Sequence, residues 1–445
     1  MKATNHIIPA ILLSLAAAAS AAAQPTTPPA AAPDAQQAAE EGGCKSLRQK
    51  ALTSTGADAV RLLGEAHTAC RQSQQTLSRE EHPVPWAVAT IDLANVTADR
   101  AIVAGGAGAL QGLDEAVGLY RQALEVLADG RSPEVWAAAQ MNLGSALQSR
   151  GIRTTGEAAL PFLQESTDRL RQALTKLTPE KDPQNWAETQ NNLGLALAEL
   201  GARKGKTAGA ADLEQAFQAF GEVQKVYTLE KQPRRWSDAR FTQARVRLAQ
   251  EDYEEAAPIL REVLAKDPDN RRALLTYNSM LVGRLDRPAE AVTLTSKYVE
   301  RHGEDVEIQM LHLDNLYAAG RIADNRLRVA SLTEKSAGLP AAIRIHLMGY
   351  EIATGLATGS KEAMDHLNDL VNLIATQPTD FRIPGSFTGS LRFIQARPEM
   401  RNSDWQIQLF HALQNRNGRD AMLAELRKLQ GAMEAAPTPA PAKEG

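Results

Sequence analysis

Apolar and polar residues recur along the chain with the spacing of amphipathic helices. In the segment 186–223, apolar positions follow one another at three- and four-residue steps, first from Trp186 to Leu200 and again from Leu213 to Val223. This spacing puts the apolar side chains on one face of a helix with 3.6 residues per turn. No stretch alternates between apolar and polar residues as a half-buried strand does. The pattern therefore predicts two antiparallel helices in each unit of the chain.

A period of 50 residues organises the first half of the chain. Tryptophan recurs at this spacing, with a proline three residues before each: Trp86, Trp136, Trp186 and Trp236. Large apolar and small residues keep the same period, as in Leu143 and Leu193, Gly144 and Gly194, and Tyr120, Leu170 and Phe220. Proline suits the first turn of a helix, and a small residue lets paired helices approach closely. A period of this size predicts stacked helix pairs.

Two copies of the unit carry a recognisable motif. The runs WAETQNNLGLALAELG at 186–201 and WAAAQMNLGSALQSRG at 136–151 resemble the tetratricopeptide repeat (TPR). More narrowly, they are similar to a bacterial variant with W-A-x-T-Q-N-N-L-G-x-A-L repeats of about 50 residues and an enlarged loop between the helices. The resemblance implies an all-α fold, a right-handed α-solenoid of antiparallel helix pairs forming a TPR-like superhelix.

The composition and spacing shifts predict seven segments in the chain. In order, we expect a signal peptide at 1–23, a Pro/Ala-rich disordered linker at 24–43, a helical hairpin with both cysteines at 44–80, TPR-like repeats of 50 residues at 81–235, increasingly divergent TPR-like repeats of 34 residues at 236–377, a loop (378–390) with a C-terminal helical cap at 378–434, and a disordered tail at 435–445.

The first 23 residues are typical of an export signal, with a basic start, an apolar stretch and small residues before residue 24. We therefore expect a cleaved signal peptide and a periplasmic or secreted protein of a Gram-negative bacterium. No later segment approaches the ~20 apolar residues that span a bilayer, so no transmembrane segment is expected after cleavage.

The sequence contains two cysteines, Cys44 and Cys70. Helices at 45–53 and 57–76, turning at Gly56, would bring the two side chains close enough for a bridge. An oxidising compartment favours a disulfide, whereas two unpaired buried thiols are the alternative. Neither is a redox site, because such pairs are spaced C-x-x-C.

Charge and motifs argue against several classes of function. The net charge of −4 is spread along the chain, without the basic patch that nucleic acid requires. The segment GARKGKT at 201–207 has three residues between its glycines, where a phosphate-binding loop has four, and it follows a helix. Four glycines near residue 105 predict a flexible interhelical loop: Gly105, Gly106, Gly108 and Gly112. No histidine pair has metal-binding spacing. We expect no catalytic residue, metal, nucleic acid or small-molecule cofactor, and no enzyme.

The resemblance implies that the first helix of each pair lines a concave groove that holds extended peptides. Asn142 and Asn192 precede the Leu-Gly pair of the motif and are placed in this groove, with Asp92 and Thr242 as their counterparts. Weaker candidates lie nearby: Asn95, Asn191, Arg240 and Arg245. Alternatively, Asn142 and Asn192 only bridge adjacent repeats, because polar groups between helices are often structural.

The function that these features favour is a non-enzymatic scaffold that binds a partner protein or peptide at the bacterial cell envelope. A second hypothesis is an accessory protein that handles cell-wall or other glycans, in which exposed aromatic side chains would stack on sugars. A third is a purely structural oligomer.

Overall fold

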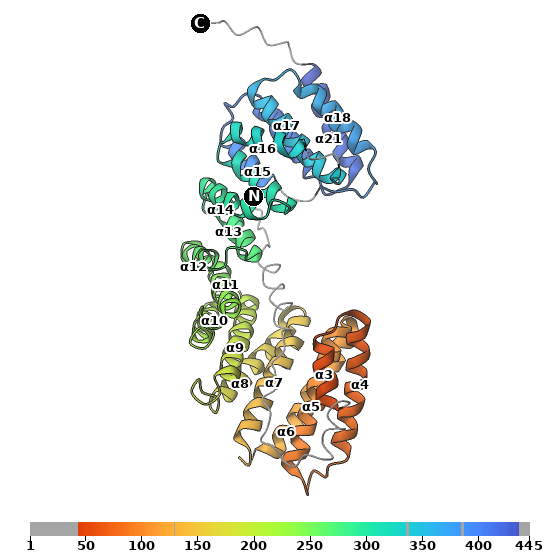
Figure 1. Ribbon diagram of the computed structural model, residues 1–445, viewed down its shortest axis with the longest axis vertical. Coiled ribbons are helices and arrows are strands. Elements are labelled where there is room, and N and C mark those ends of the chain that lie inside the picture. Colours follow the sequence, from red (N-terminus) through yellow and green to blue (C-terminus); the bar gives the residue numbers. More distant parts are fainter. Residues whose placement is uncertain (1–42, 129, 335–337, 384–386, 436–445) are drawn as a thin grey trace. The chain divides into compact units, whose positions relative to one another are not determined.

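A computed structural model of the chain describes residues 43–128, 130–334, 338–383 and 387–435. Every regular element within these residues is a helix (Figure 1). The chain divides into two compact units, unit 1 up to Ile259 and unit 2 from Leu260, and each is considered by itself. The predicted signal peptide, all but the last residue of the predicted linker, and all but the first residue of the predicted tail lie outside the described residues.

Unit 1 is built from helices that pack in successive pairs, as the 50-residue period predicts. The pairs are α3 (Cys44–Leu52) with α4 (Gly56–Gln75), α5 (Pro83–Ala104) with α6 (Gly106–Leu127), α7 (Pro133–Arg153) with α8 (Leu160–Leu174), and α9 (Pro183–Lys204) with α10 (Ala210–Val223). They are followed by α11 (Pro233–Ala249) and α12 (Tyr253–Lys266), and the division between the units falls within α12.

The motif prolines begin the first helices of the repeats. Pro83, Pro133, Pro183 and Pro233 are the first residues of α5, α7, α9 and α11. Proline is favourable there because its missing N–H would have no partner inside the helix anyway. At α9 the carboxylate of Asp182 also accepts a hydrogen bond from the N–H of Asn185, at 3.1 Å. These predicted helix starts are confirmed.

The small residues of the motif allow paired helices to touch. A Cβ atom added at Gly144 would lie 2.6 Å from Cγ of Leu170, and one added at Gly194 would lie 2.8 Å from the ring of Phe220. Leu170 and Phe220 occupy the same position of the 50-residue period on the second helices. Each glycine therefore faces the large apolar residue of its own pair, and the predicted close approach is confirmed.

Between α5 and α6 the predicted enlarged loop is wrong. The first helices α5, α7 and α9 contain 22, 21 and 22 residues, whereas α11 contains 17. Gly105 alone separates α5 from α6, so Gly106, Gly108 and Gly112 are helical and not part of a loop. Gly112 suits the helix because a Cβ atom there would lie 2.7 Å from Cβ of Ala101 on α5. The additional residues lengthen the packed helices.

The second helices of unit 1 are joined by a ladder that also keeps the 50-residue period. The arginines lie at positions 71, 121 and 171, and their partners lie 44 residues later: Arg71 with Glu115 at 3.3 Å, Arg121 with Glu165 at 2.8 Å, and Arg171 with Gln215 at 2.9 Å. Exposed pairs of this kind contribute about 0 to 1 kcal/mol each, so they align the helices more than they stabilise them.

Unit 2 continues the helix pairs and closes with three further helices. The pairs are α13 (Arg271–Gly283) with α14 (Pro288–Arg301), α15 (Val306–Ala318) with α16 (Ile322–Thr333), and α17 (Ala341–Thr358) with α18 (Ala363–Ala375); α19 (Thr388–Gln395), α20 (Ser403–Leu413) and α21 (Arg419–Glu434) follow. One apolar cluster joins α15, α17 and α18 to the last three helices, with Tyr317, Tyr350, Phe387 and Phe410 fully buried in it.

The predicted loop at 378–390 ends earlier than the sequence suggests, because α19 begins at Thr388. The carboxylate of Asp314, in α15, accepts hydrogen bonds from the backbone N–H groups of Gly389 and Ser390, each at 3.0 Å. It therefore satisfies donors in the first turn of α19 that have no partner inside that helix. A side chain 75 residues away determines this helix start, which no local pattern could indicate.

Candidate partner-binding surface

The first helices of unit 1 lie side by side in sequence order, since α5 contacts α7, α7 contacts α9, and α9 contacts α11. We call their outward side the first-helix face. On α7 and α9 its half-exposed residues are Ala138, Asn142, Ser145, Ser149, Asn185, Glu188, Asn191 and Asn192. Residues three or four apart share one side of a helix, so these side chains form one polar strip on each of the two helices.

Asn142 and Asn192 lie on this face and also bridge adjacent repeats. The amide nitrogen of Asn142 donates to Oδ1 of Asn95 at 3.0 Å, and that of Asn192 donates to Oγ of Ser145 at 3.0 Å. The two contacts join equivalent positions of the 50-residue period. The bridging alternative is thus present in the structure, and the half-exposed amides retain further hydrogen-bonding capacity towards solvent.

Asn95 is held more firmly than its neighbours. Its Oδ1 accepts a second hydrogen bond, at 2.6 Å, from the hydroxyl of Tyr120, which is buried in α6. Burial raises the pKa of the Tyr120 phenol well above its ordinary value, so the hydroxyl keeps its proton and acts as a donor. Asn95 therefore links three helices, and its role in packing accounts for both of its bonds.

The remaining sequence candidates differ in exposure. Asn191 is half-exposed on α9, and Arg240 is half-buried on α11, where it donates to Oε1 of Gln243 at 2.9 Å. Arg245 is only 6% exposed, and its guanidinium lies 5.9 Å from the centre of the Phe241 ring. A side chain this buried does not line an open groove, so that assignment is corrected.

At the start of unit 1, α3 covers the outward side of α5. The structure joins Cys44 to Cys70 by a disulfide with a Cα–Cα distance of 4.8 Å. Arg48 pairs with Asp99 at 2.6 Å, and Lys45 pairs with Asp92 at 3.4 Å.

Burial raises the pKa of the Asp92 carboxyl, and the nearby Lys45 and Arg48 oppose that rise. The first-helix face is therefore closed at α5 and open at α7 and α9.

A charged cluster lies where α9 and α11 begin. Nη1 of Arg235 donates to the hydroxyl of Tyr227 at 2.7 Å and lies 3.5 Å from Oε1 of Glu188, which also accepts from Gln184. Burial raises the pKa of the Glu188 carboxyl, against the effects of Gln184 and Arg235. Its Oε2 is buried and has no hydrogen-bond partner among the described residues. This cluster was not predicted from the sequence, although Asn185 and Arg235 share one position of the 50-residue repeat.

In unit 2 the corresponding side of the first helices is occupied by α19. Besides the bonds to Gly389 and Ser390, Asp314 accepts from Oγ of Ser390 at 2.7 Å and from the hydroxyl of Tyr350 at 3.1 Å. Arg392 of α19 donates to the carbonyl oxygens of Val282 and Gly283 at the end of α13, at 3.0 and 2.7 Å. The chain's own α19 thus covers α13 and α15, and the open first-helix face is restricted to unit 1.

The segment at 201–207 has a structural explanation. Residues 201–204 still belong to α9, so the predicted basic loop begins only at Gly205. A Cβ atom at Gly209 would lie 1.8 Å from the carbonyl oxygen of Gly201, which makes glycine necessary where the chain turns back on itself. Lys204 pairs with Asp212 at 2.8 Å, and Lys206 pairs with Glu251.

Among the described residues, no group of three or more His, Cys, Asp or Glu side chains is arranged to hold a metal ion. None of the helices in the described ranges combines the length and the apolar character needed to cross a membrane.

Comparisons with known proteins agree with the helix-pair architecture. The family model "Tetratricopeptide repeat" matches residues 247–324. The search of curated proteins found no match. Among solved structures, nearly identical TPR-like repeats of a Podosopora anserina kinesin light chain are 21% identical, with a TM-score of 0.36, and cover 52% of this chain and 95% of that one.

The TPR domain of P58(IPK) is 13% identical, with a TM-score of 0.22, over 88% of this chain and 99% of that one. At these TM-scores neither likeness carries an argument. Residues 247–324 thus match the tetratricopeptide repeat, and the helices of the described residues pack in successive pairs, which is the architecture of such repeats.

Proposed function

We propose that the protein is a non-enzymatic scaffold of the bacterial periplasm or cell envelope that binds a partner protein through the first-helix face of unit 1. One observation carries the proposal: α7 and α9 lie side by side, and each keeps a strip of half-exposed, mostly polar side chains along one side of the helix. Stacked repeats use extended surfaces of this kind to bind other proteins.

The chemistry of the strip suits an extended peptide. Asn142, Asn191 and Asn192 each carry an amide that both donates and accepts, as a peptide backbone does. Such side chains hold an extended chain through its main-chain groups and leave sequence preference to neighbouring side chains.

The location at the cell envelope is proposed from the first 23 residues of the sequence. Expression of the full chain in a Gram-negative host, followed by fractionation and intact-mass measurement, tests it. The proposal expects a periplasmic product shortened by about the length of the predicted signal peptide. A full-length product in the cytoplasm would refute the location and leave the binding surface unaffected.

The glycan hypothesis finds less support in the structure. Stacking on sugars needs exposed aromatic faces, but Trp86, Trp186 and Trp236 are at most 8% exposed and pack inside the repeats. We therefore do not carry this function further.

Site-specific photocrosslinking in living cells tests the binding surface. One probe replaces Ser149 on α7, which is half-exposed and receives no side-chain hydrogen bond from a neighbouring repeat. The control probe replaces Gln172, exposed on α8 of the same repeat. The proposal expects a defined protein adduct from position 149 and none from position 172. Equal labelling at both positions, or no adduct at 149, would count against it.

A further inference from the structure

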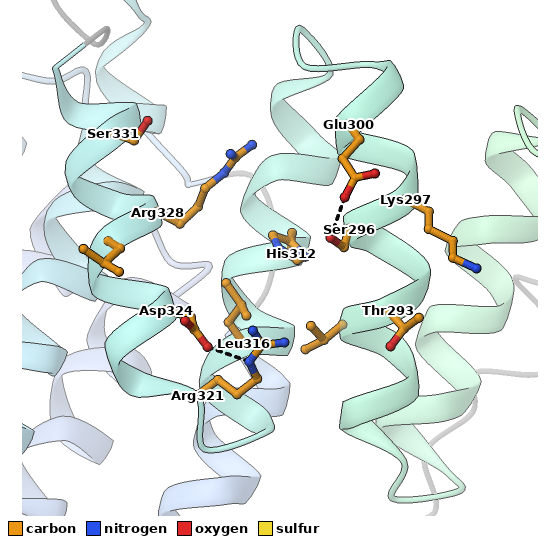
Figure 2. Close-up of a pocket in the computed structure, with 12 residues that line it drawn as sticks. Thr293, Ser296, Lys297, Glu300, His312, Leu316, Arg321, Asp324, Arg328 and Ser331 are labelled. Carbon is orange, nitrogen blue, oxygen red and sulfur yellow. Dashed lines mark hydrogen bonds and ion pairs between the residues drawn. The ribbon is translucent and has the colours of Figure 1, made fainter.

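Unit 2 contains an open pocket of about 610 Å³ on the side of its second helices (Figure 2). Helices α14 and α16 form its walls, and α15 lies behind them as the floor. Val292 of α14 and the floor residues His312 and Leu316 of α15 are at most 7% exposed. This pocket shares no residue with the first-helix face of unit 1. It lies on the side that remains open in unit 2, where α19 covers the first helices.

One wall of the pocket has an apolar side chain that is exposed to solvent. Leu327 is 71% exposed, the highest value among the large hydrophobic residues of the described chain. A single exposed leucine is ordinary on a protein surface. Here, however, it borders a pocket with two buried apolar side chains in its lining, Val292 and Leu316. An apolar group entering the pocket would remove Leu327 from water and rest against these two side chains.

The charged side chains that line the pocket carry a net positive charge. Three cations, Lys297, Arg321 and Arg328, line it together with two carboxylates, Glu300 and Asp324. Arg321 is paired with Asp324 at 2.6 Å.

Nε and Nη2 of Arg328 both donate to Oε1 of Gln309, at 3.2 and 2.6 Å. The hydrogen-bond partner of this guanidinium is therefore a neutral amide and not a carboxylate. Lys297 forms no ion pair with any described residue. Two positive charges therefore remain uncompensated by a close carboxylate.

Both arginines act on the floor of the pocket. Figure 2 shows Arg328 reaching from α16, and Arg321 from the turn just before it, into the space in front of α15, with His312 on α15 facing the same space. Nδ1 of His312 lies 2.8 Å from Oγ1 of Thr295. Burial, together with the positive charges of Arg328 and Arg321, lowers the pKa of His312 to about 4. The imidazole is thus neutral at pH 7 in a positive potential.

We propose that this pocket binds an acidic segment of a partner protein. A carboxylate of the segment pairs with Nη1 of Arg328, and a neighbouring apolar side chain packs against Leu327 and Leu316. A carboxylate paired with arginine through charge-assisted hydrogen bonds suits a guanidinium whose present partner is neutral. Charge complementarity selects an acidic segment over a basic one, because a second cation would be repelled by both arginines.

The probe is a fluorescently labelled synthetic peptide of glutamates flanking one leucine, titrated with the full chain and followed by fluorescence anisotropy. Saturable binding that weakens with added salt is expected. Arg328→Gln should weaken binding about tenfold, and Leu327→Gln about fivefold. Arg326→Gln is the matched control, since Arg326 is exposed on the same helix and does not line the pocket. Circular dichroism of each variant confirms that α16 is intact.

Any of three results would overturn the proposal. The peptide could fail to bind saturably at millimolar concentration, Arg326→Gln and Arg328→Gln could lower the affinity equally, or the affinity could stay unchanged when alanine replaces the leucine of the peptide. Light scattering adds a further outcome. A dimer of the chain that Arg328→Gln disrupts would show that a second copy fills the pocket in place of an acidic partner.

Discussion

At the residue scale, Asn95 illustrates how a polar side chain on a repeat helix holds its neighbours. The hydroxyl of Tyr120 is buried and donates its hydrogen bond to Oδ1 of Asn95, which also accepts from Asn142. A buried donor left without an acceptor loses more free energy than an exposed one, because water cannot replace the lost bond. Bonds of similar length in this array therefore differ in their contributions to stability.

Asn95→Ala should lower the free energy of unfolding by ~2 kcal/mol, since it leaves the Tyr120 hydroxyl buried without an acceptor. Ser145→Ala, which removes the partner of the half-exposed Asn192, should lower it by ~0.5 kcal/mol. Urea denaturation measures both. Adding Tyr120→Phe to Asn95→Ala should recover part of the loss, and no recovery would show that the hydroxyl is not the cause.

The glycines of the helices divide into two groups with opposite predicted effects. Gly194→Ala should destabilise the protein by ~1 to 3 kcal/mol, because the added Cβ would lie 2.8 Å from the buried ring of Phe220. Gly118→Ala, in α6, should stabilise it by ~0.5 to 1 kcal/mol, since nothing lies within 4 Å of the added Cβ and alanine is the better helix former. Thermal unfolding of both variants would reveal whether helix contact or helix propensity dominates.

His312 makes stability depend on pH. Its pKa is lowered from 6.5 to about 4 in the folded state, by burial and by Arg328 and Arg321. As the pH falls from 6.5 to 4, the unfolded chain takes up a proton that the folded chain does not. The contribution of His312 to the free energy of unfolding is therefore fully present above pH 6.5, and it falls by about 3 kcal/mol as the pH is lowered to 4.

His312→Gln should flatten this part of the profile of unfolding free energy against pH. If the wild-type and variant profiles ran parallel, folding would not lower the pKa of His312, and the prediction would be wrong.

At the element scale, the sequence predicted the helices whose signals are local. Pro83 and its three equivalents indicated helix starts, and Gly144 and Gly194 indicated the contacts between paired helices. The start of α19 could not be predicted, because Asp314 supplies its cap from another helix. The lengths of α5 and α6 were also missed: glycines near residue 105 suggest a loop, although Gly112 is helical because Ala101 packs closely against it.

The element α3 is short enough to depend on its cross-link. A helix of nine residues is marginal by itself, and α3 is held by the disulfide between Cys44 and Cys70 and by ion pairs from Lys45 and Arg48. The disulfide closes a loop with a sequence separation of 26 residues, for which chain entropy predicts a stabilisation of about 3 to 4 kcal/mol.

Reduction should therefore accelerate hydrogen exchange of the α3 amides. The double variant with Cys44→Ser and Cys70→Ser should exchange at the faster rate with or without reductant. Unchanged exchange on reduction of the wild type would show that the ion pairs alone hold α3.

At the scale of the whole molecule, the repeat period predicted an all-helical chain of stacked pairs, but not where its surfaces are open. Whether Asn142 faces solvent or a neighbour depends on the helix of the adjacent repeat, and the pocket lined by His312, Leu327 and Arg328 is assembled from three helices. Each of these residues is ordinary in its own stretch of sequence. Their shared environment exists only after the helices have packed.

The last three helices are predicted to be essential to unit 2. The side chains of Phe387, Ile394, Leu409, Phe410 and Leu426 are at most 1% exposed and belong to one apolar cluster with α15, α17 and α18. Ending the chain after residue 377 would expose that cluster and leave Asp314 without the N–H groups of α19.

We expect this truncated protein to lose helical circular dichroism beyond the share of the deleted helices and to become sensitive to protease throughout α15 to α18. Large buried side chains contribute about 1.5 to 3 kcal/mol each, so losing several exceeds the usual stability of a domain. A chain ending after residue 435 retains every described helix and is the matched control, expected to resist protease as the full chain does. If the chain ending at 377 were equally resistant, the helix pairs of unit 2 would be stable without their C-terminal cover, and α19 would be a detachable segment lying over α13 and α15.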